Sequence, residues 1–139
     1  MKEKTINILG KDVTLIYCPA TENYFEDISH KSIAVFVPTE DADGNKIPAQ
    51  ATIEDLQTLA MAAITAWAAY QKAETGVEPE APITGSDILF RLSADERNIL
   101  LGAISEIRNE WYAVGDVVAK QINEDSNKLK GKGNKRKNP

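Results

Sequence analysis

The sequence predicts an α+β fold that is mostly α: an N-terminal β-hairpin packed on a small helical bundle with two long helices, followed by a disordered basic tail. Two β-branched runs separated by a glycine predict the hairpin. Apolar residues that recur at three- and four-residue steps over two long segments predict the helices. Aromatic residues make up only 6% of the 139 residues, which favours helix-on-helix packing over an aromatic-rich β core. The length suits one domain, which we place at residues 1–125.

The hairpin is expected at residues 5–18. Residues 5–9 and 13–18 are rich in β-branched side chains, and the glycine-led stretch 10–12 between them indicates a tight turn. Alternation gives each strand one apolar face. Those faces consist of Ile6 and Ile8 in the first strand and Val13, Leu15 and Tyr17 in the second. A two-stranded hairpin is marginal alone in water, so this face must pack on the rest of the chain.

A short helix is expected over about residues 21–30, with Thr21 as its cap. Its inward face would consist of three apolar residues, Tyr24, Phe25 and Ile28. His30, the single histidine, lies at the end of this helix. It fits a surface or helix-dipole role better than that of a catalytic base, because no nucleophile stands at a suitable spacing.

Residues 33–51 allow more than one interpretation. The apolar run 33–37, which stops before Pro38, suits a buried strand or a continuation of the helix. Residues 39–51 are expected to form a polar loop with a turn at the Asp-Gly pair. A calcium loop that started at Asp41 would need glycine at its sixth position and glutamate at its twelfth. Glycine comes fourth and threonine twelfth, so the spacing excludes this metal site.

The first long helix is expected over residues 52–74. Thr52 is a suitable cap, acidic residues fill the first turn, and Gly76 follows as a natural terminator. Many small alanines would let neighbouring helices approach closely. The apolar stripe consists of Leu56, Leu59, Ala60, Ala63, Ile64, Trp67 and Tyr70.

After a proline-containing crossover, Ser86 is expected to start a short helix over residues 86–92. Ser93 and Glu96 then form a capping box that begins the second long helix, residues 94–123. Its apolar stripe consists of Leu100, Ile104, Ile107, Trp111, Val114 and Val118. Spacings of three and four suit either a homo-oligomer interface or an intramolecular seam against the first long helix, and we favour the seam.

The charge of the chain is unevenly distributed. Sixteen basic and 21 acidic residues give a net charge of −5. Residues 126–139 contain six basic residues and no acid, so the first 125 residues carry 10 basic and 21 acidic residues, a net charge of −11. The basic residues of this tail are Lys128, Lys130, Lys132, Lys135, Arg136 and Lys137. With one apolar anchor the tail is expected to be disordered, and it serves either as a cationic arm or as a solvated terminus.

The composition disfavours an enzyme. Cys18 is the single cysteine, so no intramolecular disulfide can form, and one histidine leaves little for zinc binding or for acid–base chemistry near neutral pH. No phosphate-binding glycine loop, nucleophile elbow or zinc-protease motif is present. We therefore expect no catalytic, cofactor-binding or metal-binding residues. No signal-peptide core or membrane-length apolar run occurs, which favours an intracellular protein.

Three stretches of the chain occur in a characteristic order. Residues 5–15 are Thr-Ile-Asn-Ile-Leu-Gly-Lys-Asp-Val-Thr-Leu, residues 30–32 are His-Lys-Ser, and residues 52–56 are Thr-Ile-Glu-Asp-Leu at the start of an alanine-rich helix. In this order they resemble the tail assembly chaperones of long-tailed bacteriophages and prophages. The resemblance covers most of residues 5–122. The chain departs from the family at residues 38–51, where the family more often continues in helix.

The resemblance implies a protein that binds the tape-measure protein in the infected bacterial cell and keeps it soluble until tail-tube subunits polymerise around it. Such chaperones are not enzymes, and they usually leave before the virion matures. Some members also exist in a longer frameshifted form that recruits the tail-tube protein, and AAG-GGA-AAG codons for residues 130–132 would permit a frameshift. The candidate partner-binding residues lie on the helix stripes: Trp67, Tyr70, Trp111, Val114 and Val118.

Two other functions remain open. The chain could be a small phage or mobile-element module that binds nucleic acid through its basic tail, although that tail lacks interleaved aromatic residues for base stacking. It could also be a structural component of the virion. The chaperone interpretation is preferred because the order of these stretches resembles that family.

Overall fold

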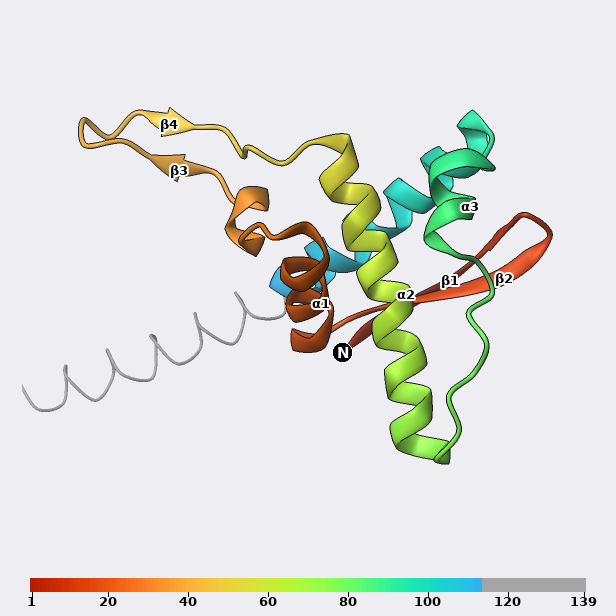
Figure 1. The fold of residues 1–139 in the computed structure, drawn as a ribbon. Coiled ribbons are helices and arrows are strands. Elements are labelled where there is room, and N and C mark those ends of the chain that lie inside the picture. The colour runs from red at the N-terminus through yellow and green to blue at the C-terminus, as the bar shows by residue number, and fades with distance from the viewer. Residues whose placement is uncertain (114–139) are drawn as a thin grey trace, which may run out of the picture.

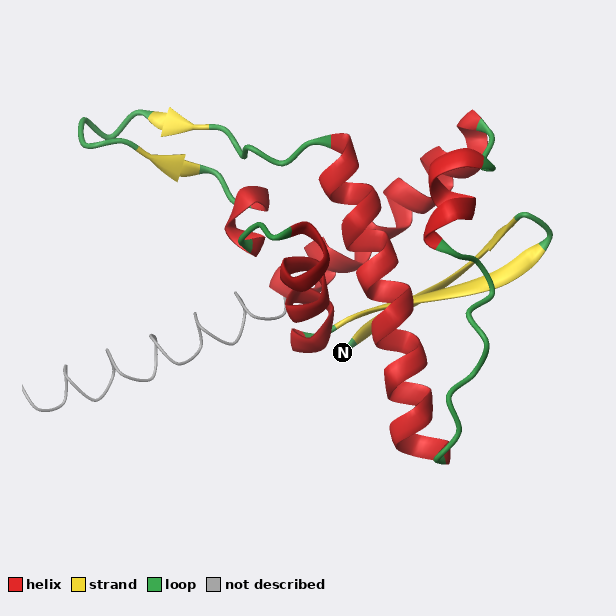
Figure 2. Ribbon diagram, in the orientation of Figure 1, coloured by secondary structure: helices red, strands yellow, loops and turns green. Residues whose placement is uncertain are grey.

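A β-hairpin and four helices dominate the part of the chain described by the structure, a computed structural model, which covers residues 1–113 (Figure 1; Figure 2). They confirm the predicted fold class, a mostly α arrangement with the hairpin packed on helices. The main elements are β1 (Lys2–Ile8), β2 (Lys11–Tyr17), α1 (Pro19–Ser29), α2 (Ile53–Thr75), α3 (Gly85–Phe90) and a further helix that is described over residues 94–113. We call the last of these the 94–113 helix. The predicted helix end at 123 and the basic tail lie outside the described residues.

The hairpin is longer and its turn tighter than predicted. Its strands pair from Lys2 with Tyr17 to Ile8 with Lys11, so the hairpin begins three residues before the predicted start at residue 5. The predicted three-residue turn is wrong, because Leu9 and Gly10 alone connect the strands, both with positive φ (53° and 69°). Positive φ at both central residues matches the twist of a two-residue hairpin.

The predicted inner face of the hairpin is confirmed. All five side chains of this face are buried: Ile6, Ile8, Val13, Leu15 and Tyr17. On the opposite face the hydroxyls of Thr5 and Thr14 lie 2.8 Å apart in an exposed cross-strand hydrogen bond. Ile16, which shares that outer face by alternation, is nevertheless buried, and the sequence pattern did not indicate this.

Helix α1 begins two residues earlier than predicted, and Thr21 is not its cap. Pro19 occupies the first helical position, where its missing N–H costs nothing, and Cys18 is the N-cap. The Thr21 side chain is instead buried and donates a hydrogen bond to the carbonyl of Ile16 at 2.8 Å. The predicted inward face is correct for Phe25 but wrong for Ile28, which is exposed.

The segment between α1 and α2 forms neither a strand nor an α-helix at residues 33–37. It is a 3₁₀ helix, η1 (Ile33–Phe36), whose Phe36 ring packs edge-on against Phe25 with 5.1 Å between centroids. The predicted polar loop contains a short ribbon of β3 (Thr39–Glu40) and β4 (Lys46–Ile47), which projects from the helices (Figure 2). The predicted Asp-Gly turn is present. Asp41 holds it by accepting hydrogen bonds from the N–H groups of Asp43 and Asn45, each at 2.9 Å.

Helix α2 matches its predicted bounds to within one residue. Thr52 is its N-cap, and Gly76 ends it with φ 78°. Asp55 completes the capping box and is itself buried, with its carboxylate 2.9 Å from the Lys31 ammonium. Leu59 and Ile64 face the core among several alanines, so α2 packs closely against both α1 and β2.

Helix α3 begins at Gly85 after a Thr84 cap and ends at Phe90, so the predicted start at Ser86 and end at residue 92 are wrong. The Thr84 hydroxyl accepts a hydrogen bond from the N–H of Asp87, as in an ordinary capping box. The 94–113 helix begins as predicted, with the reciprocal hydrogen bonds of Ser93 and Glu96 at 3.1 and 3.2 Å.

The 94–113 helix runs along the hairpin from its turn toward its open end. The Glu96 carboxylate accepts the N–H of Leu9 at 2.5 Å, Glu106 pairs with Lys4, and Trp111 packs on Tyr17 with 6.2 Å between ring centroids. The buried residues of this helix join the core that α2 also lines: Leu100, Ala103, Ile104 and Ile107. The described part of the predicted stripe is therefore an intramolecular seam.

Replacing Ile104 by alanine is expected to lower the free energy of unfolding by about 2–5 kcal/mol, because the side chain is fully buried and its removal leaves a cavity. The control Ile99→Ala, on the same helix but 46% exposed, should change it by less than about 0.5 kcal/mol. Urea unfolding followed by circular dichroism measures both values. An equal loss of unfolding free energy in the two variants would contradict the burial of this stripe in an intramolecular seam.

Replacing Asp55 tests the cap of α2. Burial raises the pKa of Asp55, but the Thr52 N–H and the Lys31 ammonium outweigh burial and hold it below the ordinary 3.8. A depressed folded-state pKa means that the carboxylate stabilises the fold above the unfolded-state pKa, and that this contribution is lost as the pH falls through the folded-state value.

Asp55→Asn is therefore expected to cost about 1–2 kcal/mol of unfolding free energy at pH 7, and progressively less as the pH falls below 3.8. The control Glu54→Gln removes an exposed acid from the same helical turn and should have little effect. Chemical unfolding across this pH range measures the difference. A loss that does not vary with pH would rule out the charge of Asp55 as its cause.

Candidate interaction surfaces

Reactive side chains are dispersed over the described part of the chain. Within residues 1–113, no three or more histidine, cysteine or acidic side chains are placed to hold a metal ion. Nor does any helix of this part have the length and apolar character needed to cross a membrane. His30 is exposed beyond the end of α1, and Cys18 is partly buried at its start. Apolar and aromatic surfaces are the prominent features of this part.

Two further carboxyl groups with a lowered pKa belong to helix caps. The N–H of Thr84 lowers the pKa of Asp87, and the N–H groups of Leu9 and Ser93 lower that of Glu96. Each carboxylate accepts hydrogen bonds at the first turn of a helix, where the helix dipole also favours negative charge. These groups stabilise helix ends and do not form an acid–base pair.

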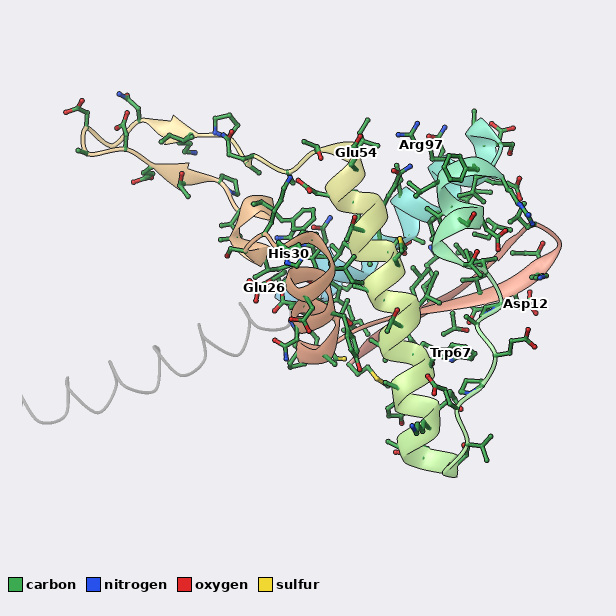
Figure 3. All side chains as sticks on the ribbon, viewed as in Figure 1. Asp12, Glu26, His30, Glu54, Trp67 and Arg97 are labelled. Atoms are coloured by element: carbon green, nitrogen blue, oxygen red, sulfur yellow. The ribbon has the colours of Figure 1, made fainter. Side chains whose placement is uncertain are left out.

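The predicted partner-binding residues occupy different environments. Trp67 lies on α2 and is partly buried (Figure 3). Tyr70, one turn later, is exposed. Trp111 packs against the core and contacts Tyr17, so its ring is already engaged inside the molecule. Val114, Val118 and the basic residues of the tail lie outside the described residues. The structure thus leaves Tyr70 as the most accessible of the predicted residues that it describes.

Helix α3 presents an apolar projection that the sequence analysis did not assign. Phe90 is 81% exposed and Leu89 60% exposed, whereas the adjacent Ile88 is only 3% exposed. Ile88 anchors the six-residue helix to the core, and the two following side chains point away from it. Two large neighbouring apolar side chains at such exposure make this helix a candidate interaction surface.

A groove of about 270 Å³ lies between α2 and the segment that leads into α3, and Ile88 rather than Leu89 or Phe90 contributes to its lining. Met61 and Ile64 of α2 form one wall, and Ile83 and Ile88 belong to the other. The start of α3 lies close to α2, since a Cβ at Gly85 would lie 2.6 Å from the flexible tip of the Met61 side chain. We call Leu89, Phe90 and this groove the α3 surface.

One signal in the sequence could have revealed the α3 surface. Ile88, Leu89 and Phe90 are consecutive, and successive residues of a helix with 3.6 residues per turn point about 100° apart. Three such side chains cannot all face the same core from one short helix. The expected helix over residues 86–92 therefore already required that some of them be exposed.

Comparisons of this chain with protein-family models, with curated proteins and with solved structures give no match. The function proposed below therefore depends on the residues, on their arrangement and on the resemblance described above.

Phe90→Ser is expected to leave the free energy of unfolding within about 0.5 kcal/mol of the wild-type value, because Phe90 packs on little of the protein. It should also reduce the fluorescence of bound anilinonaphthalene sulfonate, which reports exposed apolar surface. The matched variant Ile88→Ser buries a hydroxyl and opens a cavity, so we expect it to lose about 2 kcal/mol or more. Thermal unfolding and dye titration of both variants test whether Ile88 anchors α3 while Phe90 faces solvent. Equal stabilities of the two variants would contradict this assignment.

Proposed function

We propose that this protein is a tail assembly chaperone of a long-tailed bacteriophage or prophage. It binds the tape-measure protein in the cytoplasm of the infected bacterial cell and keeps that protein soluble until tail-tube subunits polymerise around it. It catalyses no reaction and needs no cofactor. The observation that carries the proposal is the exposure of Leu89 and Phe90 on α3, whose Ile88 also lines a groove against α2. The family named in the proposal comes from the resemblance of residues 5–15 and 52–56.

The α3 surface suits a helical, aggregation-prone client. An amphipathic helix can place apolar side chains into a groove of this kind and cover exposed aromatic residues. Fully burying Leu89 and Phe90 would contribute roughly 1.5–3 kcal/mol each. Binding with a dissociation constant of 1 mM already requires about 4 kcal/mol, so one such contact is weak. Many chaperone copies, each held by a weak contact, would coat an extended client. Incoming tail-tube subunits could still displace them.

The remaining parts of the proposal follow from the same arrangement. Tyr70 extends the client-binding surface on α2, and the exposed part of the Trp67 side chain also contacts the client. Copies of the chaperone bound side by side on one client form the proposed homo-oligomer. A longer frameshifted form would carry a second binding function, for the tail-tube protein.

Co-expression with the tape-measure reading frame expected beside this gene tests the proposal. The wild-type chain should keep the tape-measure protein in the soluble fraction and co-purify with it. The double variant Leu89→Ser, Phe90→Ser should reduce the soluble client several-fold, because the apolar contact is removed. The control Ile28→Ser changes one exposed apolar residue on α1 and should leave the yield unchanged.

Other outcomes separate the alternatives. A genome with no tape-measure frame near this gene, or a client equally soluble with the double variant, would contradict the chaperone. Recovery of the chain from purified particles would favour a virion component. Binding to DNA or RNA that weakens with salt and is abolished by deleting residues 126–139 would favour the nucleic-acid module.

A further inference from the structure

Arg108, on the 94–113 helix, lies close to two aromatic rings, one on η1 and one on its own helix. The central carbon of its guanidinium is 5.3 Å from the centroid of the Phe36 ring and 4.8 Å from that of Tyr112. Both distances fall within cation–π range. Its Nη2 also donates a hydrogen bond to the Phe36 carbonyl at 3.3 Å. These contacts fix the position of a cation beside the start of the β3–β4 ribbon.

This cation has no anionic partner among the described residues. The ion pairs of residues 1–113 join other side chains, and the Nε of Arg108 is buried without a hydrogen-bond acceptor. A guanidinium has five N–H donors, of which only one has a partner within this part of the chain. A partly buried charge without a counter-charge is unfavourable, and a bound anion would relieve that cost.

The nearby carboxylate of Glu22 is already engaged. It accepts hydrogen bonds from the hydroxyl of Tyr17 at 2.8 Å and from that of Tyr112 at 2.5 Å. Burial, followed by the hydrogen bond to this carboxylate, raises the pKa of Tyr17 well above its ordinary value. Glu22 therefore holds the Tyr112 ring against the arginine and does not itself pair with the guanidinium.

An open cleft of about 430 Å³ exposes this site. The residues that line it are Phe36, Val37, Pro38, Arg108, Asn109, Tyr112 and Ala113. Most of these walls are apolar or aromatic, and Val37, 44% exposed, lies at the ribbon side. The volume falls within the range of ligand-binding pockets, about 300–1,000 Å³.

We infer that this cleft binds an aspartate or glutamate side chain of a partner polypeptide, with an apolar neighbour of that residue lying on Val37 and Phe36. A carboxylate is planar and carries one charge, so it matches the fork and the single charge of Arg108. A phosphate carries about −1.5 to −2 at pH 7 and would remain partly unneutralised between apolar walls. The inference is independent of the proposed function, because the α3 surface involves other elements.

Two blocked peptides test the inference on the full-length, ¹⁵N-labelled protein. One contains Leu-Glu-Leu and the other Leu-Gln-Leu, each flanked by alanines, and each is titrated to millimolar concentration while amide and arginine Nε resonances are recorded. The glutamate peptide should shift the signals of Asn109, Tyr112 and the Arg108 Nε in a saturable manner. The glutamine peptide should bind at least about tenfold more weakly, because it cannot form a charge-assisted hydrogen bond.

Variants at the cleft complete the test. Arg108→Gln should weaken binding of the glutamate peptide about tenfold or more, whereas Arg97→Gln, which removes the same charge from an exposed position of the same helix, should not. Val37→Asp leaves Arg108 in place and supplies a competing carboxylate at the cleft, so it should also weaken binding, even if Arg108→Gln does not fold. The inference would be overturned if the glutamate peptide gave no saturable shift or bound no more tightly than the glutamine peptide. It would also be overturned if Val37→Asp bound the glutamate peptide as tightly as the wild-type chain, or if Arg97→Gln weakened that binding as much as Arg108→Gln.

Discussion

Burial of the apolar face of the hairpin is the constraint on which the rest of the fold depends. Two strands alone bury too little surface to be stable in water. Here α2 packs on β2, and the 94–113 helix is attached at both ends of the hairpin, through Glu96 at the Leu9 turn and through Trp111 on Tyr17. The hairpin and the 94–113 helix therefore each supply the surface that the other needs.

That packing also decides which surfaces remain for partners. Trp111 and the seam of the 94–113 helix face the core, whereas Leu89 and Phe90 of α3, which Ile88 anchors, are left exposed. The Arg108 cleft lies on other elements, where η1 meets the 94–113 helix. The two surfaces differ in physical character. Apolar contacts at α3 would respond little to salt, whereas the ion pair inferred at the partly buried Arg108 would weaken as ionic strength rises.

Much of the fold could be predicted because its signals are local. The Thr52 cap with Gly76 bounds α2, and the Ser93–Glu96 capping box starts the 94–113 helix, as expected from side chains that bond their own backbone. The segment 33–51 could not be predicted in this way. Its 3₁₀ turn depends on Phe36, which packs on Phe25 and offers its carbonyl to Arg108, 72 residues further along the chain.

The sequence by itself determined the order of the main elements, the inner face of the hairpin and the caps of α2 and of the 94–113 helix, because periodicity and capping act within a few residues. The tertiary structure alone decided which apolar side chains are left in solvent. Trp111 and Phe90 are both large aromatic residues on helices, yet one is packed on Tyr17 and the other is 81% exposed. Local pattern cannot separate them, since exposure depends on which distant elements arrive to cover each helix face.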